Sequence, residues 1–171
     1  IEQGQIEGAH FSSDGTPVDR NSVFQVASMS KWLTAWGVMA LVQDGTLDLD
    51  APVSDYLTRW QLPESEFDAS GVTVRRLLSH TSGLDDGLGY DGFDTPEERQ
   101  TLEASLTKAA DASPGNSGIV SLGAEPGSGW NYSGGGYTLL QLIIEEVTGQ
   151  SFSDFMAARV FEPLRMTRST F

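Results

Sequence analysis

The stretch that most constrains this chain is Ser28-Met29-Ser30-Lys31, because a long apolar segment follows it and ends at Gly45. The apolar residues recur at helical spacing and fill most of the circumference, which predicts a buried central helix over about 28–44. They are Met29, Trp32, Leu33, Trp36, Val38, Ala40, Leu41 and Val42. Gly45 suits the left-handed residue that often ends a helix. Because positions three apart share a helix face, we expect the Ser28 hydroxyl and the Lys31 amine to be neighbours.

A serine beside a lysine at the start of a buried helix has a specific chemical use. A serine hydroxyl becomes a good nucleophile when a base removes its proton. A lysine amine becomes that base when apolar surroundings lower its pKa, and Val26, Trp32 and Leu33 are candidates to supply them. The free N–H groups of the helix N-terminus can stabilise an oxyanion. The alternative is that Ser28 only caps the helix and Lys31 is a solvated residue of its first turn.

The composition excludes several other classes of function. The 171 residues include no cysteine, which excludes a thiol nucleophile and a disulfide framework, and the two histidines, His10 and His80, are too few for a histidine-rich metal site. The formal charge of -14 opposes binding to nucleic acid and to anionic membrane surfaces. No apolar run is long enough to span a bilayer. The sequence leaves the compartment open between cytoplasmic and periplasmic or secreted.

The rest of the chain predicts a mainly helical fold. Residues 1–11 have the pattern of strand and turn. Further helices are expected over about 52–57, 74–80, 96–110, 137–148 and 151–160. Thr73 and Thr95 stand where side-chain caps start two of these helices, and Gly149 stands where an apolar helix ends.

Two loops are rich in residues that carry chemistry. His80 ends a helix and precedes Thr81-Ser82-Gly83, and the sequence places no carboxylate beside it. We therefore expect His80 to orient neighbouring loops by hydrogen bonds, with direct catalysis as the alternative. The segment 85–94 is rich in Gly and Asp but lacks the ligand pattern of a calcium loop, which predicts a surface loop.

A glycine-rich run, residues 126–137, precedes the last long apolar helix. One interpretation is a phosphate cradle at a helix N-terminus, but the run lacks the final glycine of the dinucleotide pattern and is not followed by Gly-Lys-Ser/Thr. The other is a tight loop that presents Tyr132 beside another group. A tyrosine at such a position also commonly serves packing alone.

The order of these motifs resembles a known family. Ser28-x-x-Lys31, His80-Thr81-Ser82-Gly83-Leu84, Pro126-Gly127 with Tyr132-Ser133, and Pro163-Leu164-Arg165-Met166-Thr167 follow one another as in serine hydrolases related to class C β-lactamases, D-Ala-D-Ala peptidases and family VIII carboxylesterases. The resemblance implies an α/β (α+β) fold, an antiparallel sheet flanked by helices plus a helical subdomain, of which this chain is the mainly helical part.

The same resemblance implies an acyl-enzyme mechanism. Ser28 would attack a carbonyl, Lys31 and Tyr132 would share the general-base and general-acid work, and the Ser28 N–H would be an oxyanion donor. No metal or organic cofactor is implied. The expected partner is a small-molecule ester, β-lactam or peptide-like substrate.

Two departures from the family pattern stand out. Gly134 occupies the place of the asparagine in Tyr-x-Asn, which favours ester substrates, and no Lys-Thr-Gly-like third motif follows Tyr132. We therefore interpret residues 1–171 as a partial β-lactamase-like domain that lacks the C-terminal strands, to be completed by a further segment or a second chain. A catalytically silent scaffold or binding module is the alternative function.

Overall fold

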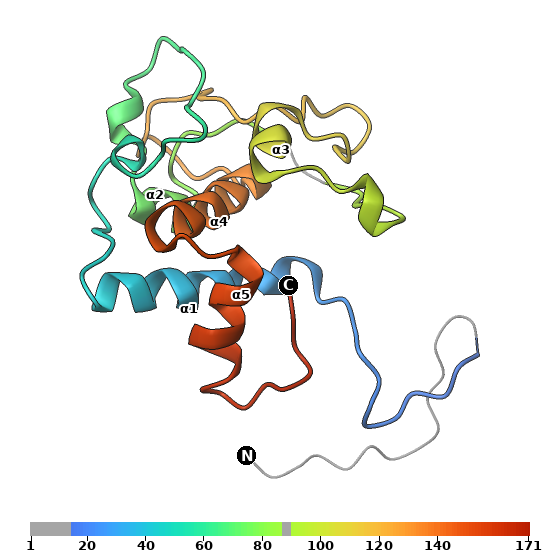
Figure 1. Ribbon diagram of the computed structural model, residues 1–171. Coiled ribbons are helices and arrows are strands. Elements are labelled where there is room, and N and C mark those ends of the chain that lie inside the picture. The colour runs from blue at the N-terminus through green and yellow to red at the C-terminus, as the bar shows by residue number, and fades with distance from the viewer. Residues whose placement is uncertain (1–14, 87–89) are drawn as a thin grey trace.

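The computed structural model describes residues 15–86 and 90–171, and in these ranges helices alternate with long loops (Figure 1). The described residues form no β-strand, and isolated bridges join Pro52 to Thr73, Leu84 to Leu122 and Tyr90 to Ala112. The prediction of a mainly helical chain is thus confirmed. The strand and turn expected over residues 1–11, with His10, lie outside the described residues.

The helices fall near the predicted positions. The α-helices are α1 (Ser30–Gln43), α2 (Val74–Leu78), α3 (Leu102–Lys108), α4 (Gly134–Thr148) and α5 (Phe152–Met156). Helix α5 continues into a π-helical turn, Ala157–Phe161, and short 3₁₀ turns cover Ala27–Met29, Val53–Asp55, Ala69–Gly71 and Pro96–Glu98. The continuous helix expected over 96–110 is wrong, because the Thr101 side chain accepts the N–H of Ala104 at 3.2 Å and starts α3 afresh.

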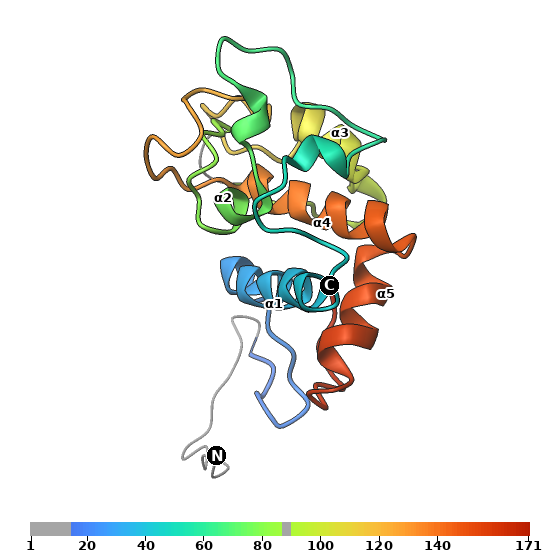
Figure 2. The same cartoon turned by 90° about the vertical axis from the view of Figure 1, so that its left-hand side faces the viewer.

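Helix α4 forms the centre of the core. It contacts α1, α2, α3 and α5, and it lies between α1 and α3 in both side views (Figures 1 and 2). Its fully buried side chains are Leu139, Leu140, Leu142, Ile143 and Ile144. The Ser133 Oγ caps its start by accepting the N–H of Gly136 at 2.8 Å, and Gly149 ends it with φ +67°.

Helix α1 is less buried than its sequence predicts. One side, with Val38 and Leu41, packs into the core, and Gly37 lies so close to α5 that a Cβ there would be 2.6 Å from the Met156 Sδ. On the other side Trp32 is 77% exposed and Trp36 is 57% exposed. The prediction of a helix buried all round is therefore wrong in this structure. The predicted end is confirmed, with Gly45 at φ +80°.

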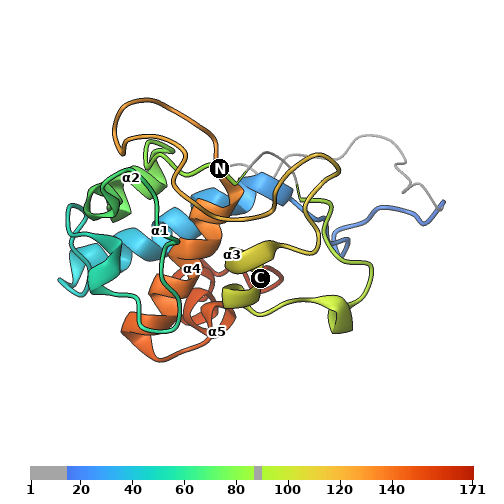
Figure 3. The same ribbon diagram turned by 90° about the horizontal axis from the view of Figure 1, so that it is seen from above.

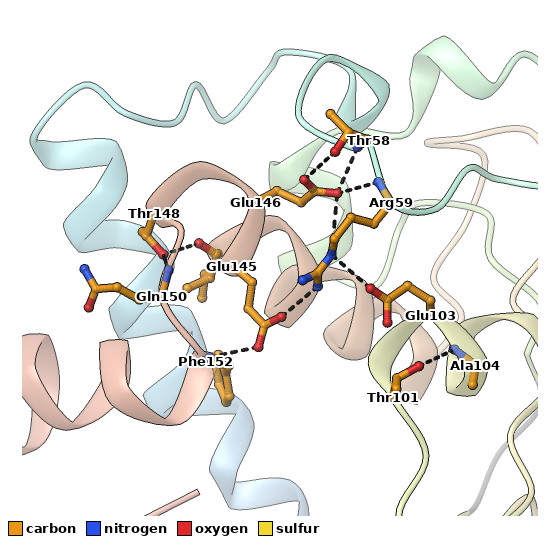
Figure 4. Close-up of polar contacts among 11 residues, drawn as sticks. Thr58, Arg59, Thr101, Glu103, Ala104, Glu145, Glu146, Thr148, Gln150 and Phe152 are labelled. Carbon is orange, nitrogen blue, oxygen red and sulfur yellow. Dashed lines mark hydrogen bonds and ion pairs between the residues drawn. The ribbon is translucent and has the colours of Figure 1, made fainter.

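The C-terminal end of α4 carries a carboxylate that anchors a loop (Figure 4). The Glu146 carboxylate accepts the Thr58 N–H at 2.9 Å, the Thr58 hydroxyl at 2.8 Å and the Arg59 N–H at 2.7 Å. The Glu146 side chain is only 8% exposed. The loop at 58–59 is thus tied to the last turns of α4.

Arg59 connects the same end of α4 to α3 and, through Glu145, to α5. Its guanidinium donates to Glu145 at 2.7 Å and lies 2.9 Å from Glu103 of α3. The other oxygen of Glu145 accepts the N–H of Phe152, the first residue of α5, at 3.0 Å (Figure 4). This end of α4 is therefore the point where α3, α4, α5 and a loop are joined.

Candidate active site

Ser28 lies in the 3₁₀ turn Ala27–Met29, directly before α1. The preceding residue, Ala27, has φ +45°, a conformation that is uncommon for a residue with a side chain and is often found at functional sites. Ser28 is exposed, and its side chain caps neither the turn nor α1. The alternative that Ser28 serves only as a helix cap is not supported.

The three predicted site residues meet at the Ser28 hydroxyl. The Tyr132 hydroxyl donates to the Ser28 Oγ at 2.8 Å, and the Lys31 Nζ donates to the same oxygen at 3.4 Å. The N-terminal ends of α1 and α4 lie on the same side of the molecule, which brings the loop before α4 to the start of α1 (Figure 3). Ser28 and Tyr132 are 104 residues apart in the chain.

The surroundings of Lys31 differ from those expected. Val26 is 45% exposed and Trp32 is 77% exposed, so the prediction that they bury the amine is wrong. Two aromatic rings face it instead. The Lys31 Nζ lies 5.0 Å from the ring centre of Tyr132 and 5.5 Å from that of Tyr137, within the range of cation–π attraction.

The same cluster changes the acidity of Tyr132. Burial alone would raise the pKa of the phenol, but hydrogen bonding with Lys31 and Ser28, together with the positive charge of Lys31, outweighs burial and holds the pKa of Tyr132 below its usual value. A phenol with a lowered pKa gives up its proton more readily. Tyr132 is therefore better suited to proton transfer than a free tyrosine.

His80 holds the chain on both sides of Tyr132. Its carbonyl accepts the Asn131 N–H at 2.9 Å, and its Nδ1 accepts the Ser133 N–H at 3.2 Å. The rings of His80 and Tyr132 are 4.4 Å apart, centre to centre. The prediction that His80 orients a neighbouring loop is confirmed, and the loop is the one that carries Tyr132.

The environment of His80 favours the neutral imidazole that this contact needs. Burial lowers its pKa, the charge of Lys31 lowers it further, and Asp86 opposes both. A neutral ring keeps an unprotonated Nδ1 as acceptor for the Ser133 N–H, with the proton on Nε2.

Asp86 is a site residue that sequence reasoning missed. It is 1% exposed, so the prediction of a surface loop over 85–94 is wrong at this residue. Its carboxylate accepts the Ser133 hydroxyl, the Gly135 N–H at 2.9 Å and the Tyr90 hydroxyl at 2.6 Å. The negative charge at the N-terminus of α4 suits the helix dipole. Asp86 thus fixes the residue that follows Tyr132.

Neither a metal site nor a membrane span is found in the part of the chain that the structure describes. Across residues 15–86 and 90–171, no group of three or more His, Cys, Asp or Glu side chains could hold a metal ion. No helix in the same ranges is long and apolar enough to cross a bilayer.

Comparison with known proteins defines the class. The family model described as Beta-lactamase matches residues 3–171. The chain is 37% identical over 153 residues to penicillin-binding protein 4* of Bacillus subtilis (strain 168), which covers 90% of this chain and 31% of that protein. It is 34% identical over 174 residues to the esterase EstB of Burkholderia gladioli, which covers 95% of this chain and 42% of that protein.

A solved structure agrees in fold. The penicillin-binding protein from Bacillus halodurans superposes with a TM-score of 0.67 at 29% identity, over 92% of this chain and 45% of that one. The chain belongs to the β-lactamase family, the fold class of penicillin-binding proteins and related serine hydrolases. It spans less than half the length of each of these three relatives.

Proposed function

We propose that this protein is a serine hydrolase that forms an acyl-enzyme on Ser28 and acts on carboxylic esters. The observation that carries the proposal is the meeting of three groups at one oxygen: the Ser28 Oγ is within hydrogen-bond reach of the Tyr132 hydroxyl at 2.8 Å and of the Lys31 amine at 3.4 Å. A nucleophile, a proton acceptor and a cation in one contact are the parts that acyl transfer requires.

The acylation step uses each group once. Tyr132 first loses its own proton to solvent, and the charge of Lys31 stabilises the phenolate. Ser28 Oγ then attacks the carbonyl carbon of the ester, and its proton passes to the phenolate oxygen of Tyr132. The lowered pKa of Tyr132 supports this role. The Ser28 N–H is our candidate donor to the oxyanion of the tetrahedral intermediate.

Collapse of the intermediate and hydrolysis complete the cycle. The carbonyl re-forms, the bond to the leaving alcohol breaks, and Tyr132 returns its proton to the alcohol oxygen. A water molecule then attacks the acyl group on Ser28 with Tyr132 as base, and the carboxylic acid is released while Ser28 recovers its proton.

The choice of an ester over a β-lactam or a peptide rests on Gly134. At that position the family pattern has an asparagine, and this chain has no side chain to bind a substrate amide. The likeness to a protein named as an esterase, at 34% identity, agrees with this choice.

Covalent labelling tests the proposal, in the full natural polypeptide that carries these residues. We expect a fluorophosphonate to add to Ser28, as shown by intact mass and peptide mapping, and p-nitrophenyl butyrate to turn over faster than benzylpenicillin reacts. Ser28→Ala should abolish labelling, and Lys31→Met should slow it by about 10²–10⁴-fold, the usual contribution of acid–base catalysis.

Ser30→Ala is the matched control, because Ser30 belongs to the same motif, whereas the hydrogen bonds to the Ser28 hydroxyl come from Tyr132 and Lys31. It should label at the wild-type rate. Full labelling of the Ser28→Ala protein would refute the assignment. A folded wild-type protein that reacts with none of the three probes would favour a catalytically silent scaffold.

A further inference from the structure

Tyr137, in the first half of α4, presents its ring to the reactive cluster. The residue is 8% exposed, and its ring centre lies 5.5 Å from the Lys31 Nζ and 5.3 Å from the ring centre of His80. The Tyr137 hydroxyl makes a separate contact, because it donates to the carbonyl of Leu78, the last residue of α2, at 3.0 Å. This hydrogen bond ties the ring to α2 while its face remains turned to Lys31.

The Tyr137 phenol is not suited to proton transfer in this cluster. Burial raises its pKa and the neighbouring Tyr132 raises it further, so the group stays protonated near neutral pH. Its hydrogen bond goes to Leu78, whereas the hydrogen bonds to the Ser28 hydroxyl come from Tyr132 and Lys31. What Tyr137 offers the cluster is therefore the face of its ring.

The Lys31 ammonium needs such a partner. It is half-buried, and within residues 15–86 and 90–171 no carboxylate forms an ion pair with it. A cation withdrawn from water is costly unless it is paired, and the negative face of an aromatic ring can serve as the partner. The rings of Tyr132 and Tyr137 both lie within that range of the Nζ. Of these two rings, only that of Tyr132 belongs to a residue used in the proposed chemistry.

We propose that Tyr137 is a positioning residue, whose ring holds the Lys31 ammonium beside Tyr132 and Ser28 by cation–π attraction. The inference rests on the proposed function, since it needs Lys31 to assist the acylation of Ser28. Without the ring, the flexible stem of Lys31 would let the ammonium move into water. Tyr132 would then lose part of the charge that stabilises its phenolate, and acylation would slow.

A series of fluorinated phenylalanines at position 137 tests this in the full natural polypeptide. Ring fluorines withdraw charge from the ring face but keep the shape of the ring, so they weaken cation–π attraction with little change in packing. The readouts are the rate of fluorophosphonate labelling at Ser28 and kcat/KM for p-nitrophenyl butyrate. Phenylalanines with one, two and three ring fluorines should slow both reactions stepwise, by about threefold to tenfold in total relative to Tyr137→Phe.

Tyr137→Phe is the reference for this series. It keeps the ring, so both rates should stay within about threefold of the wild type, even though loss of the hydrogen bond to the Leu78 carbonyl should lower stability.

A double-mutant cycle shows whether the ring acts through Lys31. Tyr137→Leu, which removes the ring, should lower kcat/KM by about tenfold when Lys31 is present. In the Lys31→Met background, which has no cation to hold, the same change should cost less than about twofold. A residue that only packs α4 would cost the same factor in both backgrounds. If the Tyr137→Leu protein does not fold, the fluorine series decides alone, because it preserves the shape of the ring.

The outcomes separate the two proposals. Equal rates across the fluorine series, or an equal cost of Tyr137→Leu with and without Lys31, overturn the role of Tyr137. Labelling and ester hydrolysis that still depend on Ser28 would then leave the proposed function standing. A folded wild type that is neither labelled at Ser28 nor active on the ester overturns both.

Discussion

A buried carboxylate stabilises each end of α4, but the two carboxylates hold different parts of the protein in place. Each has a largely buried carboxylate that accepts three hydrogen bonds from hydroxyls and backbone N–H groups: Asp86, 1% exposed, at the start, and Glu146, with a side chain 8% exposed, at the end. Both satisfy the rule that a buried charge must be paired or hydrogen-bonded. They differ in what they hold in place.

At the start of α4, the held residue is next to the reactive cluster. Asp86 binds Ser133, and the preceding residue, Tyr132, reaches the Ser28 hydroxyl at 2.8 Å. At the end of α4, Glu146 binds Thr58 and Arg59. Arg59 pairs with Glu103 of α3 and with Glu145, whose other oxygen accepts the N–H of Phe152 in α5 (Figure 4). Asp86 positions a candidate proton-transfer group, whereas Glu146 joins a loop to the end of α4.

The dipole of α4 sharpens this difference. A carboxylate is favoured at a helix N-terminus and disfavoured at a C-terminus. The helix dipole therefore stabilises the negative charge of Asp86. It destabilises the negative charge of Glu146, and the Arg59 guanidinium, 3.9 Å away, offsets that cost. Replacing either acid by its amide should therefore lower stability, but only the change at the start of α4 should also lower activity.

The largest effect is expected from Asp86→Asn. The amide would turn one of the two acceptor oxygens into a donor, which would face either the Ser133 hydroxyl or the donors of Tyr90 and Gly135. We expect a loss of about 2–4 kcal/mol in the free energy of unfolding, the cost of breaking a buried hydrogen-bond network. Because Ser133 would shift with Tyr132, kcat/KM should fall by about 10²-fold, as happens when a catalytic group is misplaced by an ångström.

Urea unfolding and ester kinetics on the same samples would measure both quantities. The exposed neighbour Asp85 provides a matched control, and Asp85→Asn should stay within about 0.5 kcal/mol of the wild type. An Asp86→Asn protein that loses stability but keeps wild-type kcat/KM below its unfolding transition would break the comparison, because the two ends of α4 would then behave alike.

A smaller effect is expected at His80. Alanine would remove the Nδ1 acceptor of the Ser133 N–H and the ring that lies 4.4 Å from Tyr132. We expect His80→Ala to lower kcat/KM by about tenfold, equivalent to about 1.4 kcal/mol. His80→Asn keeps an acceptor oxygen and tolerates the left-handed backbone, φ +58° here, so it should recover most of the loss.

The pH profile of activity distinguishes a positioning role of His80 from a purely stabilising one. The folded-state pKa of His80 is lowered, so the unfolded chain binds the proton more readily. The stability that the neutral ring contributes is therefore present above the unfolded value of 6.5 and is lost as the pH falls through 6.5 towards the folded value. The activity of the folded wild type should contain a component that is lost as His80 is protonated, at its folded-state pKa below 6.5, and His80→Asn should remove that component. An unchanged acid limb in His80→Asn would rule out the role.

The features that sequence predicted well are local. The Ser28–Lys31 contact follows from helical spacing, and the ends of α1 and α4 follow from Gly45 and Gly149, which both adopt positive φ. The contact of Tyr132 with Ser28 spans 104 residues, and it was expected from the order of family motifs rather than from periodicity.

The features that sequence missed depend on distant partners. Besides Tyr90, Asp86 binds Ser133 and Gly135, which are 47 and 49 residues away, and no local pattern in the sequence indicates these two contacts. The ring of Tyr90 against Gly134 is a long-range contact of the same kind. For α1, the pattern shows that Trp32 and Trp36 are apolar but does not say what covers them, and both are exposed in this structure.

The smallest effect on activity is expected from Glu146→Gln, which tests the structural end of the comparison. The amide keeps one acceptor oxygen for the N–H groups of Thr58 and Arg59, so we expect a loss of about 1–2 kcal/mol in the free energy of unfolding. The Ser28 cluster is untouched, and kcat/KM should stay within about twofold of the wild type. A surface control, Glu64→Gln, removes the same charge from an exposed position.

The pH dependence of unfolding separates this anchor from a general charge effect. Burial would raise the pKa of Glu146, but hydrogen bonds from Arg59 and Thr58 outweigh it and hold the folded-state pKa below the unfolded value of 4.5. The carboxylate therefore contributes stability above pH 4.5 that is lost as the pH falls through 4.5 towards the folded value. Glu146→Gln should flatten the unfolding profile in this window, and Glu64→Gln should not. A loss of kcat/KM above tenfold in a stable Glu146→Gln protein would show that both ends of α4 serve the site.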